Sequence, residues 1–192
     1  LKYPKVLILS DDIYEKILYD NNKFYTIATV EPKLKNRTIT MNGVSKAYYM
    51  TGWRLGYCGG PKEIILGMNK IQSQSTTSTS SISMAAAVEA LNGNQDFILI
   101  HNQHFKKRRD MIVEKLNNIP GIACDTPQGA FYVYPCCAGC IDKKTPSGKI
   151  IKSDEDFMNY LLDSEGIAGV HGKAFGLSPY FRLSYAADEQ TL

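Results

Sequence analysis

Long apolar runs are missing from this sequence of 192 residues. A membrane-spanning helix needs about 18 or more consecutive apolar residues, and no run approaches that length. The first residues also lack the basic stretch, apolar core and small-residue cleavage site of a secretory leader. We therefore expect a soluble protein of the cytoplasm.

Charge of one sign is also in short supply, because 22 Lys and Arg residues are nearly balanced by 19 Asp and Glu residues. The formal net charge of +3 is too small to indicate nucleic acid or a membrane surface as a partner. The basic run 106–109 does not change this, since four consecutive residues cover every side of one helical turn. His101 and His104 have no third metal ligand nearby in the sequence.

Cysteine is too sparse for a disulfide framework. The five cysteines are Cys58, Cys124, Cys136, Cys137 and Cys140. Reduced thiols are the expected state in a protein of this size and predicted location. Cys137 and Cys140 form one C-x-x-C motif, but no second pair stands at zinc-ribbon spacing, so we expect no metal.

The stretch 38–60, TITMNGVSKAYYMTGWRLGYCGG, is the most informative part of the sequence. Its β-branched run 38–40 predicts a buried strand, and the turn dipeptide Asn42-Gly43 should end that strand. A second short apolar run, 55–58, predicts another strand. Lys46 is therefore expected on a loop at the end of the first strand.

Lys46 and Arg54 suggest chemistry at this strand end, although a lone lysine in a loop is most often a solvated charge. In α/β sheets, ligands bind at the carboxyl ends of strands. A lysine amine held unprotonated there is a nucleophile for a carbonyl, and a guanidinium binds phosphate through two N–H groups. A phosphorylated aldehyde cofactor would use both residues, with an imine to Lys46 and a bidentate contact with Arg54.

The apolar run 6–9 predicts a central parallel strand with carboxylates at its carboxyl end. Asp11 and Tyr14 are three positions apart and could project into one site. The alternative is that Asp11 or Asp12 caps a short helix that begins at Ile13. The residues alone leave both interpretations open.

Helices are expected in the middle of the sequence. The candidates are an amphipathic helix over 62–71 with Pro61 as its first residue, a second helix over 85–91 and the longest helix over 94–118. The Ser/Thr-rich run 72–83 should be an ordered polar crossing between the first two.

Short strands around one helix are expected beyond residue 121, and they indicate a compact α+β unit. The expected strands are 122–124, 130–134, 167–170 and 180–185, and the expected helix opens at Ser153 and closes at Gly166. A domain boundary should lie within or just before the longest helix.

Arg182 lies between apolar neighbours in the last strand, where a charge needs an anionic partner. That partner could be a structural ion pair or a ligand.

Five segments together resemble the second half of a fold-type I pyridoxal-phosphate aminotransferase of class I/II, closest to the bacterial aspartate aminotransferase branch. They are SDDIYE (10–15), NGVSKAYYMTGWRLGYCGGPKE (42–63), SQSTTS (73–78), GAFYVYP (129–135) and YFRLSYA (180–186). The resemblance implies an α/β fold. Residues 1–96 would be the C-terminal part of the large cofactor-binding domain, a mostly parallel sheet with helices. Residues 97–192 would be a small α+β C-terminal domain that starts with the long linking helix.

The resemblance also implies roles for matching residues. Lys46 corresponds to the lysine that forms an imine with pyridoxal 5'-phosphate and then carries the proton between the substrate Cα and the cofactor C4′. Asp11 matches the carboxylate that pairs with the pyridine nitrogen, and Tyr14 matches the phenol that hydrogen-bonds the cofactor's 3′ oxygen. Arg54 matches the phosphate clamp. Arg182 matches the arginine that holds the substrate α-carboxylate.

Two departures from the family pattern matter. Many relatives have a serine three positions before the lysine, where this sequence has Gly43, so the phosphate must rely more on other donors. The family's glycine-rich phosphate-binding helix start, its ring-stacking aromatic residue and the asparagine of its N-P-T-G segment have no counterparts here. We therefore expect a fragment of a longer protein that is inactive by itself.

The intact protein is expected to move an amino group between aspartate and 2-oxoglutarate, with an aromatic or broad-range substrate still open. The family resemblance implies a homodimer, in which the polar run 74–78 would help to bind the neighbour's phosphate. One alternative is a pyridoxal-phosphate-dependent carbon–sulfur lyase, which would release pyruvate from cystathionine without an oxo acid. Another is a non-catalytic C-terminal fragment for dimerisation or binding. The segment SKAYYMTGWRLGY favours transamination over the lyase reaction.

Overall fold

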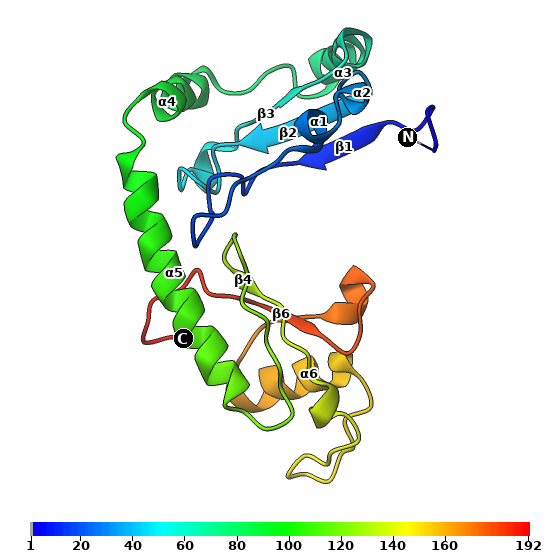
Figure 1. Cartoon of the computed structure of the whole chain (residues 1–192), viewed down its shortest axis with the longest axis vertical. Helices are drawn as coiled ribbons and strands as arrows, with labels where there is room; N and C mark the ends of the chain where they lie inside the picture. Colours follow the sequence, from blue (N-terminus) through cyan, green and yellow to red (C-terminus); the bar gives the residue numbers. More distant parts are fainter. Residues whose placement is uncertain (1) are drawn as a thin grey trace. The chain divides into compact units, whose positions relative to one another are not determined.

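A computed structural model describes residues 2–192, which form two compact units (Figure 1). The first unit runs to Ile100 and the second begins at His101. This division falls within the long helix α5 (Asp96–Asn117). The assignment of 1–96 and 97–192 to two domains stays a prediction, and Leu1 lies outside the described residues.

The first unit is built on a three-stranded sheet with the order β1-β2-β3. Its strands are β1 (Ile8–Asp11), β2 (Thr38–Gly43) and β3 (Gly56–Gly59). β1 and β2 are parallel, whereas β2 and β3 are antiparallel. This part of the chain therefore has a mixed sheet, with one parallel and one antiparallel pair of strands. An antiparallel neighbour lets the chain return after β2 through a short connection instead of a crossover helix.

β2 ends at Gly43, but Asn42 and Gly43 are the last residues of the strand and do not form the expected turn. Asn42 pairs with Tyr57 and Gly43 with Gly56 in the ladder to β3. The close approach of β3 suits glycine, because a Cβ on Gly43 would lie 3.1 Å from the backbone oxygen of Leu55. Pairing with a distant strand overrides the local turn preference of the dipeptide.

The short helix expected after β1 is replaced by tight turns. The N–H of Glu15 donates to the carbonyl of Asp12, and the N–H of Ile17 donates to the carbonyl of Tyr14, both at 2.9 Å. These bonds span three residues, as in turns, and not the four of an α-helix. Two short helices, α1 (Ile27–Val30) and α2 (Pro32–Lys35), then precede β2.

The expected helices of the middle region are confirmed with shifted bounds. They are α3 (Lys62–Ser75), α4 (Ser81–Asn92) and α5, and a short 3₁₀ turn, η1 (Thr51–Trp53), precedes β3. Pro61 is the N-cap of α3 and not its first residue. The polar crossing is only 76–80, because both helices extend into the Ser/Thr-rich run.

The second unit holds a small antiparallel sheet with the order β4-β6-β5 (Figure 1). Its elements are β4 (Tyr132–Val133), η2 (Ala138–Cys140), α6 (Asp154–Glu165), β5 (Val170–His171), η3 (Gly172–Phe175) and β6 (Phe181–Ser184). In place of the strand expected over 122–124 there is a single bridge between Ala123 and Cys136. The buried side chains of Val133, Phe157 and Tyr185 belong to the core of this unit.

None of the helices within residues 2–192 is long and apolar enough to cross a membrane. All five cysteines are free thiols, as the sequence predicts.

Candidate functional site

The turn that carries Lys46 is anchored on both sides by buried neighbours. Val44 is fully buried, and Ala47 and Tyr48 are 6% and 8% exposed. These three residues pack in one apolar cluster with Ala87 of α4 and with Ile98, Phe97, Ala90, Leu55 and Met50. Lys46 itself is half-buried. The backbone of the lysine turn is thereby fixed while the lysine side chain remains accessible.

A hydrogen-bonded link reinforces this anchor. The hydroxyl of Tyr48 donates to Oε1 of Gln95 at 2.9 Å. The amide of Gln95 donates in turn to the carbonyls of Ala90 and Gly93, each at 2.9 Å. Tyr48 therefore ties the lysine turn to the end of α4 and the start of α5, with the polar atoms of the link satisfied.

Asp11 and Tyr14 lie at the carboxyl end of β1, next to the end of β2. Asp11 is the last residue of β1, is exposed, and pairs in register with Met41. Tyr14 lies in the turns that follow, and the Nζ of Lys46 is 5.9 Å from the centre of its ring. Because the strands are parallel, their carboxyl ends meet at one edge of the sheet.

Arg54 has a left-handed backbone, with φ 53° and ψ 47°. This conformation is unusual for a residue with a Cβ, and such strain is concentrated at functional sites. Its Nη1 donates to the carbonyl of Thr51 at 3.0 Å. The guanidinium is exposed and retains further N–H donors for a ligand.

Asp11, Ser45 and Arg54 line one cavity of about 270 Å³. The other lining residues are Ile13, Met41, Asn42, Leu55 and Gly56. A carboxylate, a hydroxyl and a guanidinium therefore surround one space at the strand ends. Sequence reasoning placed Ser45 on the loop but gave it no role.

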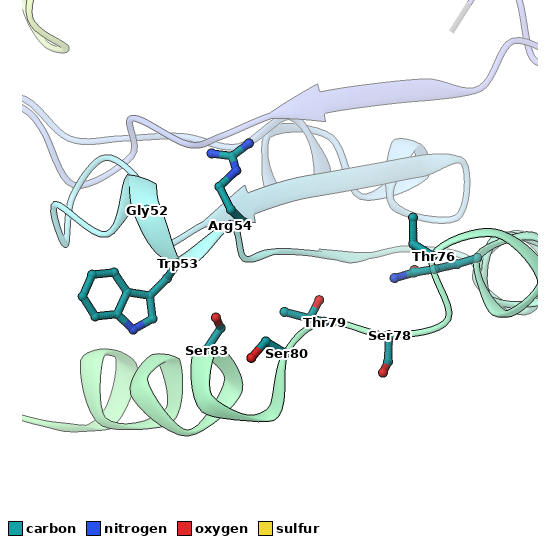
Figure 2. A pocket seen from close by; sticks show the side chains of 9 residues that line it. Gly52, Trp53, Arg54, Thr76, Ser78, Thr79, Ser80 and Ser83 are labelled. Carbon is teal, nitrogen blue, oxygen red and sulfur yellow. The ribbon is translucent and has the colours of Figure 1, made fainter.

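A second cavity of about 520 Å³ adjoins Arg54 on another side. It is lined by Gly52, Trp53, Arg54, Gln72, Thr76, Ser78, Thr79, Ser80 and Ser83. Figure 2 shows Thr79, Ser80 and Ser83 on the segment that begins α4, whereas the guanidinium of Arg54 points away from these hydroxyls. The Ser/Thr-rich run thus has an ordered place beside the arginine.

Arg182 belongs to the second unit, where its surroundings are aromatic. Its guanidinium carbon lies 4.5 Å from the centre of the Tyr132 ring and 4.6 Å from the centre of the Phe175 ring. No carboxylate forms an ion pair with Arg182 in the described part of the chain. Within residues 2–192, the structural ion pair considered from the sequence is therefore not formed.

Asp11 accepts a backbone hydrogen bond as a capping residue would, but it caps a turn and not a helix. Its Oδ1 accepts a 3.3 Å hydrogen bond from the N–H of Ile13, but no helix follows. Asp12 is the more buried of the two carboxylates, at 6% exposure, and accepts from the Ser10 hydroxyl at 2.7 Å. The carboxylate of Asp11 is thus the one left exposed at the cavity.

The basic run 106–109 has structural partners. Lys106 pairs with Asp110, and Lys107 pairs with Glu189. Arg109 is 3% exposed, pairs with Asp110 and donates to the carbonyl of Pro127. These contacts account for three of the four charges without a nucleic acid.

The C-x-x-C motif consists of thiols with little tendency to ionise. Cys137 is fully buried, and burial raises its pKa to about 12. Burial also raises the pKa of Cys140. Within residues 2–192 no group of three or more His, Cys, Asp or Glu side chains is placed to hold a metal ion.

The donor set of the first unit fits pyridoxal phosphate. The cofactor's aldehyde needs an amine, its ring nitrogen a carboxylate and its phosphate a guanidinium and hydroxyls. Lys46 carries an amine, Asp11 a carboxylate and Arg54 a guanidinium. The hydroxyl-bearing Ser45 lines the same cavity as Asp11 and Arg54. Gly43 carries no hydroxyl, and a Cβ there would meet β3.

Comparisons with known proteins agree with this chemistry. The family model "Aminotransferase class I and II" matches residues 1–192. A probable aspartate/prephenate aminotransferase of Rhizobium leguminosarum bv. phaseoli is 56% identical over the whole chain, which covers 48% of that protein. An aspartate aminotransferase of Rhizobium meliloti strain 1021 is also 56% identical, with 47% of its length covered.

Solved structures give the same result. The crystal structure of the aspartate aminotransferase from Rhizobium meliloti matches with a TM-score of 0.95 and 56% identity, over 98% of this chain and 47% of that one. A mutant of the Thermus thermophilus aspartate aminotransferase matches with a TM-score of 0.83 and 34% identity, over 97% and 48%. The chain thus spans about half the length of the relatives it matches.

Proposed function

Because the chain belongs to the class I and II aminotransferase family, we propose that the protein containing it is a pyridoxal-phosphate-dependent aminotransferase. Aspartate is the proposed amino donor and 2-oxoglutarate the proposed acceptor. The observation that carries the proposal is the cavity at the strand ends, which a carboxylate, a hydroxyl and a guanidinium line beside the anchored turn of Lys46.

Each candidate residue of the first unit has a separate proposed role, which follows from the chemistry of its side chain. When bound, pyridoxal phosphate supplies an electron-accepting ring that makes the substrate Cα proton removable. Lys46 would hold the cofactor through its aldehyde, and its Nζ would move the proton at the substrate Cα. Asp11 would hold the proton on the ring nitrogen, and the Tyr14 hydroxyl would donate to the ring oxygen. Arg54 would bind the phosphate through paired N–H groups.

Substrate recognition is assigned to Arg182. A guanidinium forms two parallel hydrogen bonds with a carboxylate, and every α-amino acid and 2-oxo acid carries one. The choice of aspartate is supported by the names of two relatives. One is an aspartate aminotransferase and the other is a probable aspartate/prephenate aminotransferase. The name of the latter makes prephenate a further substrate to test. A homodimer in the cytoplasm, with 74–78 near the neighbour's phosphate, completes the proposal.

Replacing the lysine tests this function. In the full-length protein, Lys46→Ala should lower the rate of amino transfer from aspartate to 2-oxoglutarate by about 10²-fold or more, because the covalent link and the proton carrier are both lost. The lysine-dependent absorbance that the unchanged protein develops near the visible edge with cofactor should also be missing from the variant.

The matched control is Lys62→Ala, which removes an exposed lysine at the start of α3 and should leave the rate within about twofold. A Lys46→Ala protein that keeps full transaminase activity would refute the proposed role.

A further inference from the structure

The guanidinium of Arg182 is held by aromatic rings from the two sides of its strand. β6 is the central strand of its sheet, with β4 on one side and β5 on the other. Tyr132 of β4 pairs with Ser184, which makes it a diagonal neighbour of Arg182 on the same face. Phe175 ends η3, which directly follows β5. Both ring centres lie well inside the roughly 6 Å limit for a cation–π contact.

The Phe175 ring is itself fixed by its neighbours. Tyr134 meets it edge-on, with ring centres 6.0 Å apart at 76°. The hydroxyl of Tyr134 lies 3.3 Å from the carbonyl of Gly172 and 3.4 Å from that of Leu177, at the two ends of the turn that carries Phe175. Gly172 is required there, because a Cβ would lie 2.0 Å from the backbone oxygen of Leu177.

The buried carboxylate of Asp154 binds the same η3 turn through hydrogen bonds. Asp154, 1% exposed, accepts from the N–H of Lys173 at 2.8 Å and from the Ser178 hydroxyl at 2.6 Å. The η3 turn is thus bound at its start by Asp154 and across its ends by Tyr134. The position of the Phe175 ring follows from this support.

Aromatic contacts suit an arginine that must bind a carboxylate. A ring stabilises the charge through its π face, whereas a structural carboxylate would occupy the same N–H groups that a ligand needs. A guanidinium on a long side chain also loses rotamer freedom when it binds, and prior contacts reduce that loss. Such contacts leave the hydrogen-bonding edge free and restrict where it points.

We propose that Tyr132 and Phe175 are positioning residues that form an aromatic clamp on Arg182 and so set its affinity for carboxylates. The inference rests on the proposed role of Arg182 as the binder of the substrate α-carboxylate. The clamp does not touch the reacting atoms in this account. Its loss should weaken the binding of both substrates, since the amino acid and the oxo acid present the same carboxylate.

The test is a calorimetric titration of the cofactor-loaded full-length protein with succinate, which has carboxylates but no amino group to react. Phe175→Leu and Tyr132→Leu should each raise the dissociation constant about fivefold to tenfold, as expected for a lost, partly desolvated cation–π contact. Phe175→Tyr and Tyr132→Phe keep the rings and should stay within about twofold. Tyr160→Leu, which removes a ring from α6 in the same unit, is the matched control.

Steady-state kinetics on the same variants distinguish positioning from general loss of structure. The leucine variants should raise KM for aspartate and for 2-oxoglutarate by similar factors while kcat changes less. A uniform fall in kcat with unchanged KM and succinate affinity would overturn the clamp.

Arg182→Lys separates this inference from the proposed function. If Arg182→Lys weakens succinate binding but the leucine variants behave like Tyr160→Leu, the function stands and the clamp is wrong. If Arg182→Lys leaves succinate binding unchanged, the assigned role of Arg182 fails and the clamp fails with it.

Discussion

Single side chains in the second unit carry roles that the sequence did not reveal. Asp154 could be read from the sequence only as an acidic residue in the first turn of a helix. In the structure its carboxylate is buried and accepts from Ser178 and Lys173, which follow it by 24 and 19 positions. Tyr132 and Phe175 were likewise missed, because a contact across a sheet leaves no local pattern. Lys46, Arg54 and Arg182 could be singled out since charges near apolar strands are unusual.

The Asp154 carboxylate should make the free energy of unfolding depend on pH. Burial alone would raise the pKa of the Asp154 carboxyl, but its hydrogen bonds from Ser178 and Lys173 outweigh burial and hold that pKa below its usual range. A lowered pKa means that the stabilisation is complete above the unfolded value of about 4 and is lost as pH falls through the folded value.

Asp154→Asn should therefore lower the free energy of unfolding by about 1–3 kcal/mol at pH 7, with a smaller difference at pH 3. Urea unfolding of the second unit, followed at both pH values, measures this. Asp163→Asn, on the exposed end of the same helix, is the control and should change little. Equal losses for the Asp154 variant at both pH values would contradict the linkage.

The helix with clear end signals was predicted with its bounds, whereas strands such as β3 and β6 were predicted with shifted bounds. α6 begins and ends where the sequence predicts, because Ser153 is an N-cap residue and Gly166 adopts a left-handed φ of 69°. The turn expected at Asn42-Gly43 and the strand expected over 122–124 were wrong. Whether a dipeptide forms a turn or extends a strand depends on the strand that pairs with it. Asn42 and Gly43 pair with residues of β3 and therefore extend β2.

The caps of α6 give a prediction for this element. Ser153→Ala removes the 3.1 Å hydrogen bond from the N–H of Asp156 and should cost about 1 kcal/mol of stability. Gly166→Ala should cost about 1 kcal/mol, since a Cβ disfavours the left-handed conformation. Gly166→Asn tolerates that conformation better and is the matched control. Chemical denaturation measures all three, and an Asn variant as unstable as the Ala variant would contradict the conformational explanation.

At the scale of the whole molecule, the sequence predicted an α/β fold and the family, but not the mixed sheet of the first unit. Parallel pairing of β1 with β2 brings Asp11 beside the end of β2, and antiparallel β3 returns Arg54 to the same edge. The lysine turn between them is anchored by α4 and the start of α5. The candidate site of the first unit thus depends on residues spread from Asp11 to Ile98.

The proposed covalent role of Lys46 is tested by trapping the bond between the lysine and the cofactor. The full-length protein is loaded with pyridoxal phosphate, treated with borohydride to make any lysine–aldehyde linkage permanent, digested and examined by mass spectrometry. If Lys46 forms this bond, the cofactor's mass is retained on the peptide containing Lys46. Retention on another lysine, with the Lys46 peptide unmodified, would contradict it.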